Sequence, residues 1–372
     1  MLEAPKAPLS GDKFTFLMIE DIFSLFLTVG LALTPVCAQS YSYNITKTSA
    51  WLEKQQLPDG AILYSADGIN PYFANLAAIG WLHDSSKIPQ VEAWMQWYID
   101  HVNWPDYNGL YGTVYNYTYA NGAETSTNSY DSADSNATTF LTLAEALYNT
   151  GNSGAQSFVQ NTVGEYLLNV TGNIITTLQQ SNGLVFAKPD YQIEYLMDNS
   201  EDYRGLEDFA NLAVQAWGDT STSSWYQLHA LSIRSGIRNV LYISSTGLYY
   251  PYAGSSAPNM SKFYPDAVAQ LYPAVQGAVA RSSKQAKNSY TAFNKAWPGW
   301  TNLSFSSQTP FPWAVVSYAA YLDGSRSSVN KYIETIQKKY VNRNPDFPWP
   351  FYCAEGGWFI RVNAAMEWSS RY

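Results

Sequence analysis

Apolar residues recur every three to four positions along most of the chain, which is the spacing of an amphipathic α-helix. In the stretch 130–151, with the sequence YDSADSNATTFLTLAEALYNTG, they fall at Phe140, Leu143, Ala144 and Leu147. The same rhythm predicts helices at 46–56, 70–83, 88–103, 134–150, 154–179, 201–217, 222–240, 265–280, 283–297, 310–323, 326–341 and 357–370. The pattern therefore predicts an all-α fold.

Short segments that resemble one another separate several of these helices. Each consists of glycine followed by aliphatic or aromatic residues, and each follows a turn residue; they lie at 60–64, 109–111, 183–186 and 247–250. Each precedes a helix that begins with acidic, Asn or Pro residues, as helix starts commonly do. A unit of outer helix, tight turn, short β-segment and inner helix is thus repeated about six times.

Such a repeat predicts a closed (α/α)6 toroid, a ring of six helical hairpins with short β-segments in the loops. The expected inner helices are apolar and rich in small residues, as in 73–79 and 314–320, whereas outer ones carry charge on one face, as at Lys331, Glu334 and Lys338. An open helical solenoid is the alternative. We favour closure because the unit lengths vary and no capping repeat is visible.

The beginning of the chain has the features of a targeting segment. The apolar run 22–33 is too short to span a bilayer but suits a signal-peptide core, and Val36, Cys37 and Ala38 offer small residues for cleavage. We therefore expect a signal peptide at 1–38, secretion, and a single domain with the toroid fold at 45–372. After cleavage only Cys353 would remain, so no internal disulfide is expected.

The composition restricts the partners of this protein. Charged residues make up only 14% of the chain, compared with about 25% in typical globular proteins. Aromatic residues make up 16%, with 30 Tyr and 13 Trp, and the net charge is -9. Negative charge argues against nucleic acid or an anionic membrane as a partner. Neutral carbohydrate fits better, and we expect a monomer.

Most cofactor and triad chemistries have no motif in this sequence. The three histidines, His83, His101 and His229, share no metal-ligand spacing. There is no HExxH, paired CxxC, GxSxG or phosphate-binding glycine loop. We therefore expect neither a metal nor another cofactor, and carboxylates remain as the catalytic candidates.

Acidic residues gather where the toroid would place the starts of its inner helices. They are Asp67, Asp131, Asp134, Asp190, Glu194, Asp198, Glu201, Asp202, Asp266 and Glu355. For any one of them, capping a helix is the alternative role, because the first N–H groups of a helix lack partners. Their recurrence at one end of the ring favours a functional cluster.

Glycoside hydrolysis requires two carboxyl groups in different protonation states. A helix N-terminus stabilises the ionised form, so Asp134 suits a catalytic base or charge-stabilising group, tuned by Asp131. The acid partner would need a pKa raised by burial or a like charge. We consider Glu201, Asp198 and Asp67 for that partner, in this order.

Aromatic residues interleave with these acids and present flat faces to sugar rings. Core packing is the alternative role for each of them. Together with nearby polar residues, the expected substrate-binding set is Tyr64, Tyr72, Tyr130, Tyr191, Tyr195, Tyr203, Arg204, Tyr264, Asp266, Trp349 and Trp358.

Several short motifs resemble those of the six-hairpin glycosidases, most nearly glycoside hydrolase family eight. The segment 133–136, Ala-Asp-Ser-Asn, resembles the family's Ala-Ser/Thr-Asp-Ala/Gly-Asp motif, with Asp134 on the first Asp and Asn136 in place of the second. The segments 198–201 and 264–267 resemble its Asp-Pro-Ser-Tyr and Tyr-Asp-Ala motifs, the latter with one insertion. The family's Ser-Glu-Gly motif, which carries its general acid, has only Asp67-Gly68 as a counterpart. The resemblance implies an inverting hydrolase of β-linked polysaccharide.

The sequence thus predicts a secreted glycoside hydrolase that cleaves a polysaccharide or oligosaccharide by carboxylate acid/base catalysis. Two alternatives remain open. A polysaccharide lyase on the same toroid would abstract a proton with Tyr or His, and a non-catalytic surface protein would bind glycans through its aromatic residues.

Overall fold

The computed structural model describes residues 40–370 of the chain. The predicted signal peptide at 1–38 lies outside the described residues. Within them, a first helix covers 40–55. The further α-helices are α2 (Pro71–Trp81), α3 (Ile88–Asp100), α4 (Ala133–Tyr148), α5 (Ser153–Phe158), α6 (Gly164–Leu178), α7 (Leu196–Leu212), α8 (Thr220–Gly236), α9 (Tyr272–Val275), α10 (Lys284–Ala296), α11 (Ala314–Asp323), α12 (Arg326–Ile336) and α13 (Cys353–Ser370).

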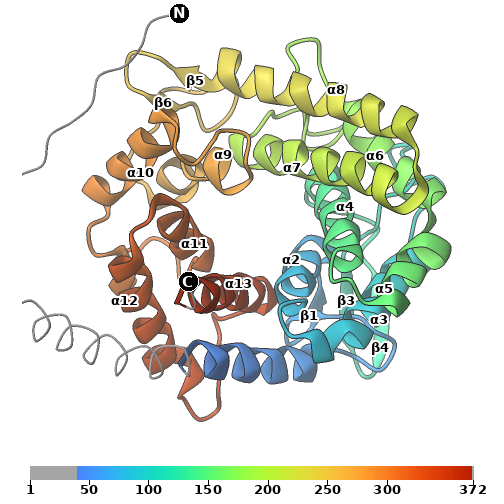
Figure 1. Ribbon diagram of the computed structural model, residues 1–372, viewed down its shortest axis with the longest axis horizontal. Coiled ribbons are helices and arrows are strands. Elements are labelled where there is room, and N and C mark those ends of the chain that lie inside the picture. The colour runs from blue at the N-terminus through green and yellow to red at the C-terminus, as the bar shows by residue number, and fades with distance from the viewer. Residues whose placement is uncertain (1–39, 371–372) are drawn as a thin grey trace, which may run out of the picture.

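The helices form a closed ring with an inner and an outer layer (Figure 1). The inner helices α2, α4, α7, α9, α11 and α13 contact one another in this order, and α13 returns to contact α2. The helix 40–55 and helices α3, α5, α6, α8, α10 and α12 surround them. The fold is therefore the predicted all-α toroid, and the open solenoid is excluded.

Glycines allow the first and last inner helices to touch where the ring closes. A Cβ atom on Gly80 of α2 would lie 2.1 Å from the carbonyl oxygen of Gly357 in α13. A Cβ atom on Gly357 would lie 2.2 Å from the carbonyl oxygen of Leu76. No side chain fits at either position, so the two backbones pack directly on each other.

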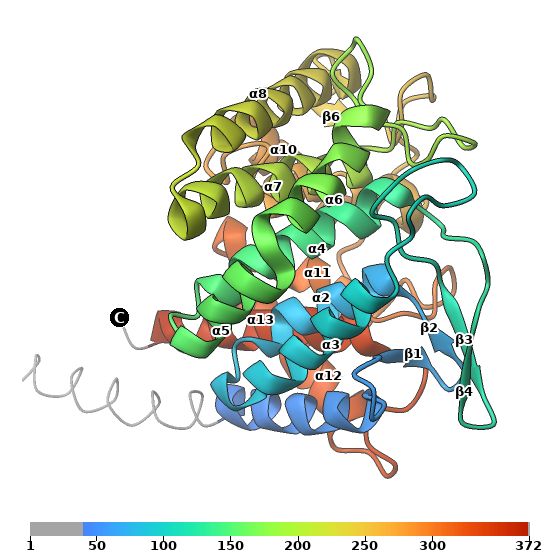
Figure 2. The same cartoon turned by 90° about the vertical axis from the view of Figure 1, so that its right-hand side faces the viewer.

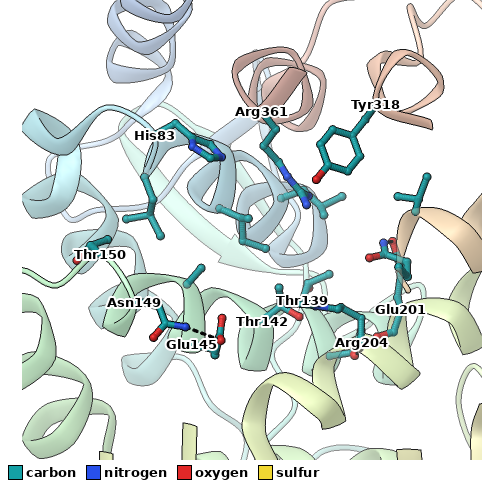
Figure 3. Close-up of a pocket in the computed structure, with 17 residues that line it drawn as sticks. His83, Thr139, Thr142, Glu145, Asn149, Thr150, Glu201, Arg204, Tyr318 and Arg361 are labelled. Atoms are coloured by element: carbon teal, nitrogen blue, oxygen red, sulfur yellow. Dashed lines mark hydrogen bonds between the residues drawn. The ribbon is translucent and has the colours of Figure 1, made fainter. Parts of the chain in front are cut away.

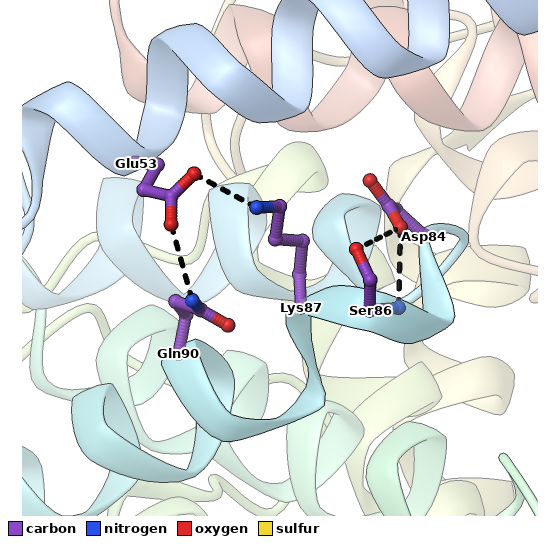
Figure 4. A network of polar contacts seen from close by, with 5 residues as sticks. All are labelled: Glu53, Asp84, Ser86, Lys87 and Gln90. Atoms are coloured by element: carbon purple, nitrogen blue, oxygen red, sulfur yellow. Dashed lines mark hydrogen bonds and ion pairs between the residues drawn. The ribbon is translucent and has the colours of Figure 1, made fainter.

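The outer helix 40–55 is fixed to its neighbour α3 by a small polar network (Figure 4). Glu53 accepts hydrogen bonds from the Lys87 ammonium at 2.8 Å and from the Gln90 amide at 3.2 Å. Asp84 caps the short turn before α3 by accepting from the backbone N–H and the hydroxyl of Ser86. These bonds orient the first hairpin of the ring.

The strands are short and lie toward one end of the ring (Figure 2). Strands β1 (Leu63–Ser65), β2 (Gly68–Ile69), β3 (Tyr117–Ala120) and β4 (Ala123–Ser126) form one antiparallel sheet, and β5 (Tyr242–Ile243) pairs with β6 (Leu248–Tyr249).

The predicted β-segments were right in part. The segment 60–64 overlaps β1, and the segment 247–250 contains β6. Val185 makes only an isolated bridge to Gln179, and 109–111 forms no strand. The β3–β4 hairpin was not predicted. It turns at Asn121 and Gly122, both of which have positive φ angles, and this pair is a recognised hairpin signal.

Three predicted helix boundaries were wrong in ways that matter for the acids. Helix α7 begins at Leu196 rather than at 201, and α13 begins at Cys353 rather than at 357. The predicted helix 265–280 is broken into a π-type turn (Phe263–Ala267) and the single-turn α9. Pro265 and Pro273 each lack an N–H to donate, which explains the break. Several acids therefore lie inside first helical turns rather than in the preceding loops.

No helix in the described part of the chain is long and apolar enough to span a membrane.

Candidate active site

A cavity of about 770 Å³ opens where the starts of the six inner helices converge. We call it the mouth cavity. Its wall includes residues from the starts of α2, α4, α7, α9, α11 and α13. Four carboxyl groups and many aromatic rings line it: Asp131, Asp190, Asp198, Glu355, Tyr72, Phe73, Tyr191, Tyr195, Tyr264, Tyr272, Phe311, Trp313, Tyr352 and Trp358. The predicted gathering of acids and rings at one opening is therefore present, although not every predicted member takes part.

Asp198 reaches the mouth cavity from the first turn of α7. This turn is fixed by Asn199, whose amide oxygen accepts the backbone N–H of Val185 at 2.8 Å and whose amide nitrogen donates to the Val185 carbonyl at 3.1 Å. Burial and the nearby charge of Asp131 raise the pKa of Asp198 to about 7. A carboxyl group with such a pKa retains a proton under mild conditions and is able to donate it.

Glu355 lines the same cavity from the first turn of α13. Its two oxygens accept the backbone N–H groups of Trp313, at 3.0 Å, and Ala314, at 2.7 Å. These N–H groups belong to the start of α11, where unpaired donors favour an anion. Burial raises the pKa of Glu355 to about 7, and the two N–H donors oppose that rise. The donors thus fix the carboxylate and favour its ionised form.

Asp134, predicted as the central carboxylate, lies behind the cavity wall. It is fully buried and is absent from the residues that line the mouth cavity. Its Oδ1 accepts the Ser132 hydroxyl and, at 2.6 Å, the backbone N–H of Ser135. Burial and the charge of Asp198 raise its pKa well above the usual range. The geometry therefore corrects the expectation that Asp134 itself faces the substrate.

Asp134 belongs to a buried group of acids shared by α4 and α7. Burial and the charges of neighbouring carboxylates raise the pKa values of Glu201 and Asp202 well above normal. Glu201, the first choice for the acid partner, does not line the mouth cavity and accepts the Tyr72 hydroxyl at 2.9 Å. The side chain of Asp202 is hydrogen-bonded to that of Asp134. Burial outweighs the opposing charge of Arg361 at Glu201, so the raised pKa values favour the protonated forms of both carboxyl groups.

Five of the predicted aromatic residues do line the mouth cavity. They are Tyr72, Tyr191, Tyr195, Tyr264 and Trp358. The hydroxyls of Tyr191 and Tyr195 are 2.8 Å apart, and the ring centroids of Tyr264 and Trp313 are 5.0 Å apart. Flat faces and hydroxyls thus surround the two carboxyl groups, as a sugar-binding cavity requires.

The other predicted site residues lie outside the mouth cavity. Tyr64, Asp67, Tyr130, Tyr203, Asp266 and Trp349 do not line it. Asp67 is exposed beside Ser65 in the β1–β2 turn. Asp266 accepts the Asn259 backbone N–H and thereby stabilises the loop before it. The Tyr130 hydroxyl donates to buried Asp106. These positions follow turn and core geometry that the sequence pattern did not reveal.

A second cavity, of about 440 Å³, lies further along the inner helices (Figure 3). His83, Glu145, Arg204, Tyr318 and Arg361 line it. Arg204, predicted to bind substrate, forms an ion pair with Asp208 at 2.6 Å, and the Arg361 guanidinium lies 4.0 Å from the ring of Trp358. Burial and the charge of Asp208 raise the pKa of Glu145 to about 7. Arg204 therefore belongs to this second cavity.

Glu355 is the residue that sequence reasoning undervalued. It was counted among the acids of the mouth but was not selected for the site. The signal was present in the segment 354–358, Ala-Glu-Gly-Gly-Trp, because its glycines indicate close helix packing next to an acid. The wrong start expected for the last helix concealed this.

Among the described residues, no cluster of His, Cys, Asp or Glu side chains could hold a metal ion.

No family model and no curated protein sequence matches this chain. Solved structures with the same fold do match over nearly its whole length. A protein described as a glycosidase is 12% identical, with a TM-score of 0.63 over 90% of this chain and 98% of the other. A variant of the glycosidase has been solved in complex with glucose.

Two further matches are the glycoside hydrolase family 63 mannosylglycerate hydrolase from Thermus thermophilus and a rhamnosidase from Klebsiella oxytoca with rhamnose bound. The first is 11% identical, with a TM-score of 0.57 over 87% of this chain and 99% of the other. The second is 9% identical, with a TM-score of 0.56 over 89% of this chain and 64% of the other. At these identities the matches establish the fold alone, the toroid of helical hairpins that this chain shares with these glycosidases.

Proposed function

We propose that this protein is a secreted glycoside hydrolase in which Asp198 is the general acid and Glu355 is the general base. The observation that carries the proposal is the pairing of two carboxyl groups, on the first turns of α7 and α13, across one cavity walled by aromatic rings. The glycosidase structures with this fold support carbohydrate as the substrate class.

The two carboxyl groups have different surroundings, and this difference assigns their roles. Asp131 disfavours a second negative charge at Asp198, so Asp198 keeps a proton for the leaving oxygen. Two N–H donors favour the charge on Glu355, so Glu355 accepts a proton from water. The water oxygen then bonds to the anomeric carbon while the bond to the leaving oxygen breaks.

An inverting outcome follows if Glu355 acts on water rather than on the sugar. Because each Glu355 oxygen is already held by an N–H group, the carboxylate is better fixed for orienting water than for moving to attack carbon. Asp134 then has a supporting role behind the wall, because the charge of Asp198 raises the pKa of Asp134 and so disfavours a second charge there.

The test is incubation with a panel of neutral oligosaccharides and polysaccharides, with assays for new reducing ends and for ultraviolet-absorbing unsaturated products. We expect reducing ends without ultraviolet absorbance, and nuclear magnetic resonance should show that the first-formed anomer is inverted. Unsaturated products would establish a lyase instead. Saturable binding without any product would establish a non-catalytic glycan-binding protein.

A further inference from the structure

Exposed aromatic side chains gather outside the mouth cavity, on the loop after α3 and on α6. Trp104 is 50% exposed, Tyr111 is 54% exposed and Tyr166 is 75% exposed. The ring centroids of Trp104 and Tyr166 are 6.4 Å apart with planes within 4° of parallel, and Tyr111 lies 6.4 Å from Trp104. We call these three residues the aromatic platform. Grouped exposed aromatic rings are unfavourable in water and commonly mark a binding surface.

The loop that carries Trp104 and Tyr111 is held rigidly. Its centre is the buried carboxylate of Asp106, which accepts the backbone N–H groups of Asn108 at 2.8 Å and Leu110 at 2.9 Å. Asp106 also accepts the hydroxyls of Thr113 at 2.8 Å and Tyr130 at 2.7 Å. The rings are therefore fixed before any ligand arrives, which lowers the entropy lost on binding.

The same loop reaches the rim of the mouth cavity. The Asn108 side-chain amide donates to the Tyr130 hydroxyl at 3.1 Å and to Asp190 at 3.4 Å, and Asp190 lines the cavity. Tyr107, which is also exposed, lies on the same loop and packs on the buried Tyr130, with a ring-centroid distance of 5.4 Å. The loop thus connects the platform to the wall of the mouth cavity.

The platform offers flat faces, hydroxyls and an indole N–H, and it contains no charged side chain. Pyranose rings have apolar faces and peripheral hydroxyls that match such a surface. A nucleic acid would need basic residues, and the chain has a net charge of -9. We propose that the platform binds a neutral glycan chain that extends out of the mouth cavity, so that the substrate is a polymer rather than a short oligosaccharide. This inference rests on the function proposed for the mouth cavity.

The first test measures binding of the full chain by native electrophoresis in gels that contain barley β-glucan, konjac glucomannan or soluble starch. At least one polymer should retard the parent protein. Trp104→Ala and Tyr166→Ala should each weaken retardation about tenfold, which corresponds to about 1.4 kcal/mol. Absence of retardation by all three polymers, or equal retardation of parent and variants, would overturn the inference.

Trp225→Ala is the matched control, because Trp225 is 53% exposed on the outer helix α8, outside the platform. It should be retarded like the parent. Since all three side chains are exposed, the variants should keep the parent's melting temperature and circular dichroism. A loss of retardation in Trp225→Ala equal to that in Trp104→Ala would show a non-specific surface effect and refute the platform.

The second test separates this inference from the proposed function. Reducing ends are measured on the retarding polymer and on a tetrasaccharide derived from it. Trp104→Ala should raise KM for the polymer about tenfold and leave kcat/KM for the tetrasaccharide unchanged. Retardation without reducing ends would refute the hydrolase but keep the glycan site. Hydrolysis with identical parent and variant kinetics on both substrates would refute the glycan site alone.

Discussion

The mouth cavity and the second cavity are lined by the same inner helices but by different chemistry. The mouth cavity forms at the starts of α4, α7 and α13, with Asp131 just before α4 and with Asp198 and Glu355 in first turns. The second cavity takes middle turns of these helices, with Arg204 and Arg361. Helix N-termini favour negative groups, which accounts for the acids at the mouth. The two arginines lie too far from a helix end for this effect, and Asp208 and the ring of Trp358 hold them instead.

Glu145 and Glu201 also line the second cavity, so acids are not confined to the mouth. Burial raises the pKa of Glu145 to about 7, the same value that burial gives Asp198 and Glu355. A shifted pKa alone therefore does not identify a catalytic group. The position of the group beside aromatic walls and a suitable partner distinguishes the mouth cavity.

The largest expected effect comes from removing either carboxyl group of the mouth cavity. Asp198→Asn and Glu355→Gln should each lower kcat about 10³-fold, because each removes one proton-transfer partner. Initial rates of reducing-end formation measure this. Glu145→Gln is the control with the same pKa in the second cavity, and its rate should stay within about twofold of the parent. Full activity of Asp198→Asn would refute the assignment of Asp198 as the general acid.

Both cavities depend on closure of the ring, which Gly357→Ala should weaken. The new methyl group would meet the Leu76 carbonyl, so we expect a loss of about 3 kcal/mol in unfolding free energy. Urea titration measures it. Gly154→Ala is the matched control in exposed α5, where the higher helix propensity of alanine should change the unfolding free energy by at most about 1 kcal/mol. Equal stabilities of the two variants would contradict the direct backbone contact.

Asp202→Asn tests the buried acids behind the mouth cavity. The folded-state pKa of Asp202 lies above its unfolded value, so its contribution to stability is present below about pH 4 and is lost as pH rises toward the folded pKa. The amide has no proton to lose and should raise the unfolding free energy at pH 8 by about 1–3 kcal/mol. Thermal melts at pH 4 and pH 8 should show a gain only at the higher pH. A gain of equal size at both would disprove the linkage.

The smallest expected effect is a change in the pH profile. With both pKa values about 7, a protonated Asp198 and an ionised Glu355 coexist most often near pH 7, which predicts a bell-shaped profile centred there. Asp131→Asn removes a charge that raises the Asp198 pKa, so the alkaline limb of kcat/KM should move to lower pH. The acidic limb, set by Glu355, should stay in place. Movement of the acidic limb alone would reverse the assigned roles.

The ring could be predicted well because the patterns that indicate its helices and turns are local in the sequence. The 3.6-residue rhythm located the helices, and the recurring glycine-led segments indicated closure. The site was harder, because which acids face the cavity depends on where each helix begins. Asp131 precedes α4 and lines the mouth cavity, whereas Asp134 lies in the first turn of α4 and is buried behind the wall. Glu355 acquires its role from Trp313 and Ala314, some forty positions earlier, and no local pattern reports such a contact.

The contact between Gly80 and Gly357 also constrains how this architecture can vary. An open array of repeats gains or loses a unit at its end, whereas here the two backbones that meet fix the circumference. An inserted hairpin would separate them and expose both helix faces to water. Lengthening of the chain is therefore tolerated only in the connections between helices, and several of these connections form the wall around Asp198 and Glu355.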